Sequence, residues 1–178
     1  MLLAEVLPAT AQDLTTLNWE FSSQGLPVTL SPPRSITITA LVSQPNRFAP
    51  TTSLFAGTGG AGVYRSIDSG RTWAAVNSGL AALTVNTLFV DDFSLYAGTT
   101  NGLFRTIDGG QSWTRVPVSI GTFGATFITA GAVGSFDNRK VLFVGSSNGV
   151  FRSVDDGTTW EYYNRGMSST QFITTLLF

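Results

Sequence analysis

The chain has 178 residues, enough for one domain, and its content of 43% hydrophobic and 12% aromatic residues is enough to form a buried core. It contains no His and no Cys, which excludes imidazole or thiolate zinc sites and Ser/His/Asp or Cys/His catalysis. The formal net charge is -1 and no apolar run approaches the ~18 residues of a membrane span. We therefore expect no nucleic-acid binding and no membrane insertion.

Residues 1–30 contain at most part of a repeating unit. Met1–Gln12 is partly apolar, but it carries Glu5 and no basic residue, which favours a strand or a mature N-terminus over a signal peptide. Trp19–Leu26 is similar to Trp73–Leu80, the end of the next unit. The chain is therefore expected to open with the last strand of a preceding unit, a partial blade over residues 1–30.

Three similar units follow, over residues 34–79, 82–118 and 122–165. Equivalent Asp residues at positions 68, 108 and 155 lie 40 and 47 residues apart, close to the ~40–50 residues of one propeller blade. The units consist of short runs of Val, Phe, Thr and Tyr broken by Gly, which argues against a helical repeat. The sequence predicts an all-β chain, a β-propeller of four-stranded antiparallel blades with three complete blades and partial blades at both ends. Residues 1–178 form one propeller domain or a fragment of one.

Each unit predicts four strands. The third strands follow turns that contain Asn101-Gly102 or Asn148-Gly149, the residue pair best suited to a two-residue hairpin, and the fourth begin at Trp73, Trp113 and Trp160. The first strands are expected at Ile36–Val42, Val85–Val90 and Thr126–Ala130, the second at Leu54–Gly57, Leu95–Gly98 and Val141–Gly145, and the first strand of a next blade within residues 171–178.

One motif, S/T-x-D-x-G-x-S/T-W, occurs in every complete unit. Its positions are Ser66, Asp68, Gly70, Thr72 and Trp73; Thr106, Asp108, Gly110, Ser112 and Trp113; and Ser153, Asp155, Gly157, Thr159 and Trp160. The motif resembles the Asp-box, or BNR repeat, of β-propeller proteins such as sialidases, xyloglucan hydrolases, sortilin-type receptors and photosystem II assembly factors. The carboxylate is expected to accept hydrogen bonds from the turn, and the Trp to pack on the neighbouring blade.

Two other interpretations of the glycine-rich turns are disfavoured. Calcium needs ~6–8 oxygen ligands, and each box offers only one or two carboxylates without the spacing of a calcium loop. Residues 57–62 match G-x-G-x-x-G, but a strand and not a helix follows, so the match is a lengthened hairpin turn. No metal and no cofactor is expected. Arg65, Arg105 and Arg152 recur at one repeat position and are assigned to packing within the repeat or to solvent-facing side chains, since equivalent positions do not converge.

The resemblance implies that ligands bind on the face made by the loops between second and third strands and between units. The candidate residues on these loops are Thr99, Asn101, Ser146, Asn148 and Arg165. Arg165 is the one ionisable residue there, whereas glycoside hydrolysis usually needs two carboxyl groups.

The remaining loop charges lie on the opposite face. Asp91, Asp92 and Asp137, with Arg139 and Lys140, fall between first and second strands and are expected to be solvated turn charges.

These observations favour a non-catalytic interaction or scaffold module that binds a protein or a glycan, and that forms a homo-oligomer or part of a longer propeller through open strand edges. The alternative is a fragment of a BNR-repeat glycoside hydrolase, sialidase-like or xyloglucanase-like, whose catalytic residues lie outside this chain. The low Lys content and the Thr/Ser/Gly-rich surface favour a secreted or cell-surface protein, with the cytoplasm left open.

Overall fold

The computed structural model describes residues 25, 36–45, 52–120, 123–124, 127–167 and 173–176. Over these ranges the chain is all-β, with three four-stranded antiparallel sheets, a two-stranded hairpin and no helix. No helix in the described ranges could therefore span a membrane. In sheet 1 the strand order is β1 (Ile38–Pro45), β2 (Thr52–Thr58), β3 (Val63–Ser66) and β4 (Ala74–Ala75). In sheet 2 it is β5 (Val85–Val90), β6 (Leu95–Thr99), β7 (Gly102–Thr106) and β8 (Thr114–Val116). In sheet 3 it is β11 (Ile128–Phe136), β12 (Arg139–Ser146), β13 (Gly149–Ser153) and β14 (Glu161–Tyr162).

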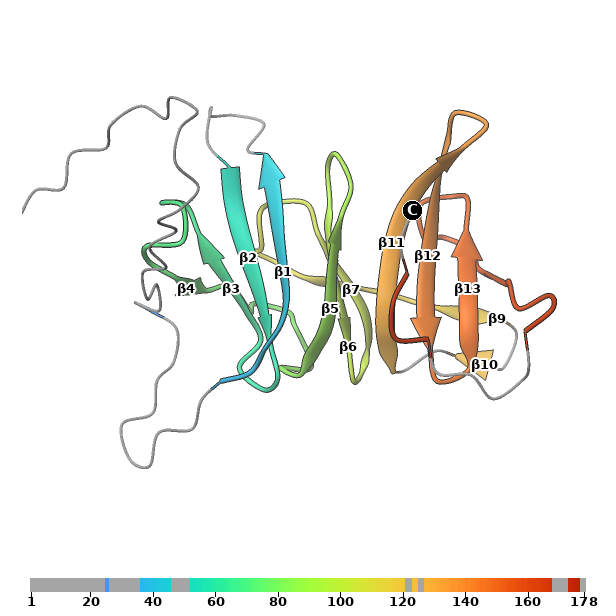
Figure 1. The fold of residues 1–178 in the computed structure, drawn as a ribbon, viewed down its shortest axis with the longest axis horizontal. Helices are drawn as coiled ribbons and strands as arrows, with labels where there is room; N and C mark the ends of the chain where they lie inside the picture. The colour runs from blue at the N-terminus through green and yellow to red at the C-terminus, as the bar shows by residue number, and fades with distance from the viewer. Residues whose placement is uncertain are drawn as a thin grey trace, which may run out of the picture.

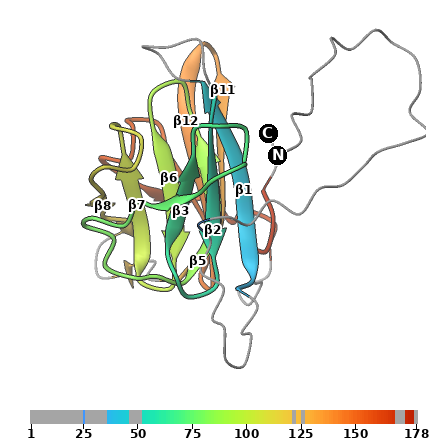
Figure 2. The same ribbon diagram turned by 90° about the vertical axis from the view of Figure 1, so that its left-hand side faces the viewer.

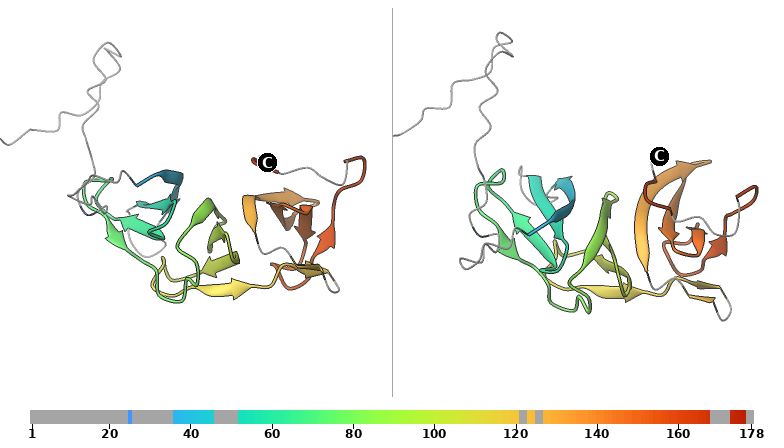
Figure 3. Two further views of the ribbon diagram at one scale, coloured as in Figure 1. Left: turned by 90° about the horizontal axis from the view of Figure 1, so that it is seen from below. Right: turned by 60° about the horizontal axis from the view of Figure 1, so that its bottom comes forward.

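The three sheets follow one another along an arc, with sheets 1 and 3 at its ends (Figure 3). Their first strands, β1, β5 and β11, lie next to one another in the row (Figure 1). Seen from the end of the row, β7 and β8 lie on the opposite side from β1 (Figure 2). We call the contact between sheets 1 and 2 the first seam, and that between sheets 2 and 3 the second seam.

A hydrogen bond joins each first strand to the next. The β1–β2, β5–β6 and β11–β12 pairings each skip one residue near the start of the first strand. In sheets 1 and 2 this skipped residue reaches across: Thr39 Oγ1 donates to Val85 O at 2.7 Å, and Asn86 Nδ2 donates to Ile128 O at 2.8 Å. The irregularity in the ladder thus sets the register between neighbouring sheets.

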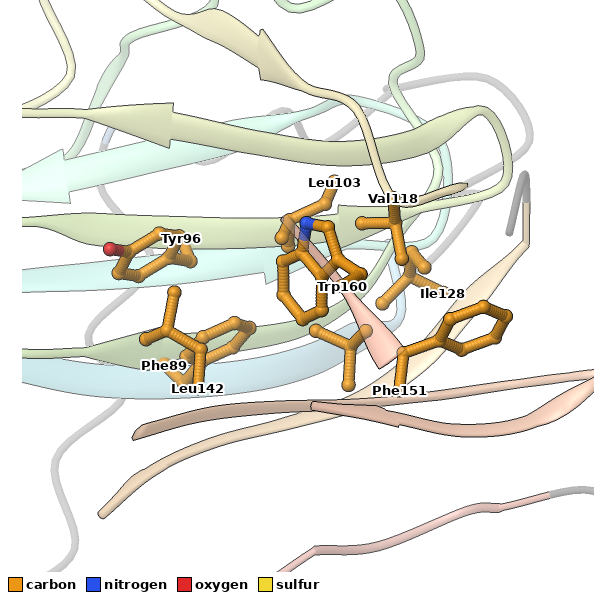
Figure 4. Close-up of a cluster of buried hydrophobic side chains, with 9 residues drawn as sticks. Phe89, Tyr96, Leu103, Val118, Ile128, Leu142, Phe151 and Trp160 are labelled. Carbon is orange, nitrogen blue, oxygen red and sulfur yellow. The ribbon is translucent and has the colours of Figure 1, made fainter. Parts of the chain in front are cut away.

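Each seam is filled by a buried apolar cluster. In the first seam, Phe55 of sheet 1 and Leu95 and Phe104 of sheet 2 are almost completely buried. In the second seam, Phe89 and Tyr96 of sheet 2 pack with Leu142 and Phe151 of sheet 3, and the Phe89 and Tyr96 rings stack at 4.8 Å (Figure 4). Because each sheet contributes to its neighbour's core, single sheets cannot bury their apolar faces alone.

The other expected strands of the three units agree with the structure to within three residues at each end, and two larger differences remain. The first strand of the third unit was expected at Thr126–Ala130, but β11 runs to Phe136. The Gly residues after Ala130 weakened the strand signal, yet Gly131 is needed there, since a Cβ would lie 2.0 Å from the Phe89 ring. The short hairpin of β9 (Ser119–Ile120) and β10 (Phe123–Gly124) was expected to be a loop.

The expected partial blades fall mostly outside the described residues. Of residues 1–30 only Gly25 is described, and of residues 171–178 only 173–176, which form no strand. Both partial blades remain predictions.

Candidate functional site

The three motif turns, which we call the box turns (residues 66–73, 106–113 and 153–160), share one hydrogen-bond pattern. In the first, the Thr72 amide and the Ser66 hydroxyl donate to Asp68 Oδ1 at 2.9 and 2.8 Å, and the Thr72 hydroxyl donates to Oδ2 at 2.6 Å. The Ser66 hydroxyl also accepts from the Gly70 amide at 2.9 Å. The same bonds recur around Asp108 and Asp155. Each carboxylate is therefore committed to its own turn.

These bonds favour the charged carboxylates. Hydrogen bonds from Thr72 and Ser66 lower the pKa of Asp68 to about 2, and those from Thr159 and Ser153 do the same for Asp155. Burial opposes the charge on Asp108, but hydrogen bonds from its turn outweigh this and also lower its pKa to about 2. A carboxyl group held ionised in this way is a poor proton donor for glycoside hydrolysis.

Two of the three box Trp residues, Trp113 and Trp160, lie at the seams. Trp113 belongs to the first-seam cluster, and its Nε1 donates to Val76 O of the preceding unit at 2.7 Å. Trp160 belongs to the second-seam cluster and donates to Gly157 O at 3.1 Å (Figure 4). Trp73 is half-buried, and its buried Nε1 has no hydrogen-bond partner among the residues that the structure describes.

A glycine with positive φ marks the joint between units. Gly79 (φ 82°) packs against the Trp113 backbone so closely that a Cβ would lie 2.4 Å from Trp113 O. Gly25 (φ 90°) lies in the same way against Trp73, where a Cβ would lie 2.0 Å from Trp73 O. No described residue lies within 4 Å of this position at Gly166 (φ 83°), the end of the third unit. Among the described residues, the joint is thus occupied before the first and second units and open after the third.

The five candidate residues of the loop face divide into two groups. Thr99 and Ser146 are completely buried, and each hydroxyl closes its own turn by accepting from the amide two residues on and donating to the carbonyl three residues on. Asn101, Asn148 and Arg165 are exposed. A ligand on this face could reach the exposed three, whereas the two buried hydroxyls serve the hairpins.

Sequence reasoning missed two Asn residues beside these turns. Asn77 Oδ1 accepts from the Val63 amide, and Asn164 Oδ1 accepts from the Val150 amide, both at 2.7 Å. A Cβ on the facing glycine, Gly62 or Gly149, would lie 2.3 Å from the Asn side chain. Their shared repeat position, followed two residues later by Gly, was the available signal.

The opposite face holds a charged cluster in the second seam. Lys140 pairs with Asp91 at 2.7 Å and with Asp156, and Arg105 pairs with Asp156 at 2.9 Å. The Tyr96 hydroxyl lies 3.3 Å from both carboxylates. The expectation that Asp91 is a solvated turn charge was wrong, because its side chain is 3% exposed.

Burial and pairing act in opposite directions on this cluster. Burial disfavours the charge on Asp91, but the bonds from Lys140 and from the Phe93 and Ser94 amides outweigh it and lower its pKa. Burial also disfavours the charge on Lys140, and the two carboxylates raise its pKa. Burial and the Asp91 charge raise the pKa of Tyr96. Asp91 and Lys140 therefore both stay charged near neutral pH, and their ion pair ties sheet 2 to sheet 3.

The recurring Arg residues do not converge. Arg65 and Arg105 lie at equivalent places, one in each seam, while Arg152 pairs with Glu161 of its own sheet and lies 4.6 Å from the Tyr163 ring centroid. No group of three or more His, Cys, Asp or Glu side chains in the described part of the chain could hold a metal ion.

No family model matches the chain, and no curated protein matches it. Among solved structures, it is similar to the computationally designed Ika4 protein at 16% identity, over 82% of this chain and 81% of that one, with a TM-score of 0.55. The extracellular domain of BT4673 from B. thetaiotaomicron matches at 19% identity over 62% of this chain, with a TM-score of 0.51. The chain spans only 15% of that structure's length. The GH74 xyloglucanase from Xanthomonas campestris matches at 21% identity over 61% of this chain and 20% of its own, with a TM-score of 0.45. The likenesses to the Ika4 protein and to the BT4673 domain support an all-β fold of propeller type and extend no further than the fold.

Proposed function

We propose that this chain is a non-catalytic BNR-repeat propeller module whose role is interaction, and that it assembles with further copies of itself through its C-terminal end. The observation that carries the proposal is the state of the joints: described residues fill them beside Trp73 and Trp113, and no described residue fills the joint at Gly166. The committed carboxylates of the box turns support a non-catalytic role.

The contacts of Ile173 support the same assembly. Gly57 of sheet 1 faces Val85, and Gly98 of sheet 2 faces Ile128. In both cases the facing residue begins the first strand of the next sheet. Gly145 of sheet 3 faces Ile173 in the same way, and the Thr129 hydroxyl donates to Ile173 O, at the repeat position from which Thr39 donates to Val85 O. Ile173 therefore stands where the first strand of a fourth blade would begin.

This segment has room for a pairing partner. Residues 173–176 pair with no strand among the described residues, and Thr174 and Thr175 are exposed. An extended segment that pairs with no described strand can take up a strand from another chain. A second copy is the proposed partner, because each copy consists of sheets of the same repeat, and one more sheet of this kind would continue the row after sheet 3.

The test measures the molar mass in solution by light scattering and sedimentation. The protein concentration runs from roughly 1 to 200 µM, which covers assembly with Kd values in that range. The unaltered chain is expected to form concentration-dependent oligomers. Thr175→Pro removes a backbone donor from the pairing segment and should shift the protein to monomer, whereas Thr175→Ala should not. A second variant, Gly166→Asn, places a side chain in the open joint and should also weaken assembly. Ser69→Asn, at an exposed residue that also has positive φ, serves as its control.

The alternative of a hydrolase fragment predicts a different result. Release of reducing sugar from xyloglucan or of sialic acid from a sialoside by the purified chain would overturn the non-catalytic role. A monomer at all concentrations, with the amides of residues 173–176 protected from hydrogen exchange, would overturn assembly through this end.

A further inference from the structure

The two seams present the same side-chain arrangement at one place. In the first seam, Arg65 Nε and Nη2 donate to Ser53 Oγ at 3.2 and 3.0 Å, and its guanidinium carbon lies 5.8 Å from the Phe55 ring centroid. In the second seam, Arg105 Nε donates to Ser94 Oγ at 2.8 Å, and its guanidinium carbon lies 5.7 Å from the Tyr96 ring centroid. The two Arg side chains are thus held in matching positions by matching neighbours.

What faces these Arg side chains differs. Arg105 binds the carboxylate of Asp156, next to the Lys140 and Asp91 pair. The repeat position of Asp156 is Gly109 in the second box turn, and that of Asp91 is Gln44 in β1. The first seam therefore lacks both carboxylates at the place where the second seam supplies them.

A cavity occupies this place. It has a volume of about 450 Å³ and is lined by residues of both sheets, including Phe55, Arg65, Phe93, Ile107 and Gly109. This is within the range of small-molecule sites, ~300–1,000 Å³. Arg65 forms no ion pair with any described residue, and its remaining contact is a long 3.5 Å bond from Nη1 to Gly109 O.

Two carboxylates also line this cavity. Asp108 is bound on both oxygens by Ser112 and Thr106 of its own turn, and Asp92 is exposed at the rim. Neither pairs with Arg65, so the guanidinium keeps donors for an incoming anion.

We propose that this cavity binds a small carboxylic acid with an apolar body, its carboxylate on Arg65 and its body against Phe55, Phe93 and Ile107. The ligand carboxylate would take the place that Asp156 holds beside Arg105 in the second seam. A planar guanidinium fixed by Ser53 and a flanking aromatic surface suit a carboxylate on a hydrocarbon group.

The test uses phenylacetate as the probe, with the neutral 2-phenylacetamide as its matched control, in an NMR titration of the amide resonances. Phenylacetate is expected to shift the Gly109 and Phe93 amides with a Kd of about 1 mM, and phenylacetamide to bind at least tenfold more weakly. Arg65→Gln keeps a donor for Ser53 and should lower the affinity about tenfold. Arg71→Gln removes an exposed positive charge away from the cavity lining and should leave binding unchanged.

A gain-of-contact variant tests the same geometry without a ligand. A Cβ on Gly109 would lie 3.2 Å from Arg65 Nη1, and the equivalent Asp156 already tolerates a φ of 62°, close to the 70° of Gly109. Gly109→Asp should therefore raise the Tm by about 2–4 °C over Gly109→Asn, which fills the same space without charge. It should also abolish phenylacetate binding.

Three results would overturn the proposal. They are equal binding of phenylacetate and phenylacetamide, unchanged binding by Arg65→Gln, and a Tm for Gly109→Asp that does not exceed that of Gly109→Asn. None depends on the oligomeric state, so this test is independent of the assembly proposed above.

Discussion

The box turns and the seams of this chain are built on different scales. Each box turn is complete within eight residues, and all three have the same hydrogen bonds. Each seam is assembled from distant strands and loops, and the two differ: the second holds a paired charged cluster where the first holds a cavity. Local motifs are thus copied with the repeat, while contacts between sheets are set separately at each seam.

The largest effect is expected at a seam, from Trp113→Ala. The indole is 5% exposed, belongs to the first-seam cluster and donates to Val76 O, so its removal leaves a large void and an unpaired carbonyl. We expect a loss of about 3–5 kcal/mol in the free energy of unfolding, measured by urea denaturation. Trp73→Ala is the matched control and should cost less, since Trp73 is half-buried and its Nε1 bonds to none of the described residues. Equal losses would show that the seam contacts do not distinguish the two Trp residues.

A smaller loss is expected from Lys140→Met, which breaks the charged cluster of the second seam. Asp91 would remain buried with bonds from the Phe93 and Ser94 amides but no cation. Because Lys140 is partly exposed, we expect a loss of about 1–2 kcal/mol, recovered in part by adding Asp91→Asn. Thermal unfolding of the unaltered chain, of Lys140→Met and of the double variant Lys140→Met/Asp91→Asn measures these differences in stability. A stability equal to that of the unaltered chain would mean that the cluster contributes nothing to the seam.

The mildest change is a pH dependence from the box turns. The pKa values of Asp68, Asp108 and Asp155 are about 2 in the folded chain, against 3.8 for an ordinary Asp. Between these values the unfolded chain binds more protons, so the stabilisation is complete above pH 4 and is lost as the pH falls towards 2. Unfolding free energies between pH 2.5 and 5 measure this slope.

Two variants provide the comparison for this pH dependence. Asp108→Asn should flatten the slope, and Asn101→Ala, at an exposed residue outside the box turns, should leave it unchanged. An identical slope in Asp108→Asn and the unaltered chain would show that the hydrogen bonds of the turn do not lower the pKa of Asp108.

The difference between turns and seams also separates what the sequence could predict from what it could not. The sheets follow from Gly-punctuated runs and the 40- and 47-residue spacing, and β5 was placed at its observed bounds, Val85–Val90. Local patterns did not reveal the full length of β11, because the need for Gly131 comes from Phe89 of another sheet.

The same reason explains the misassigned Asp91. Its surroundings in sequence are those of a turn, and its partner Lys140 lies 49 residues away. The cavity beside Arg65 was equally hidden, since it depends on which residues of two units face one another. Thr99 and Ser146 illustrate a further limit: a hydroxyl next to a turn can face a ligand or its own hairpin, and composition does not distinguish them.

The bond from each first strand to the next bears on how such a chain can grow in evolution. Its donor is a side chain, Thr39 or Asn86, but its acceptor is a main-chain carbonyl, which every residue type provides. A duplicated unit inserted after either strand would meet a usable acceptor at once, with no compensating substitution. Gene duplication could thus lengthen the row of sheets one unit at a time, and later substitutions could make each new contact different.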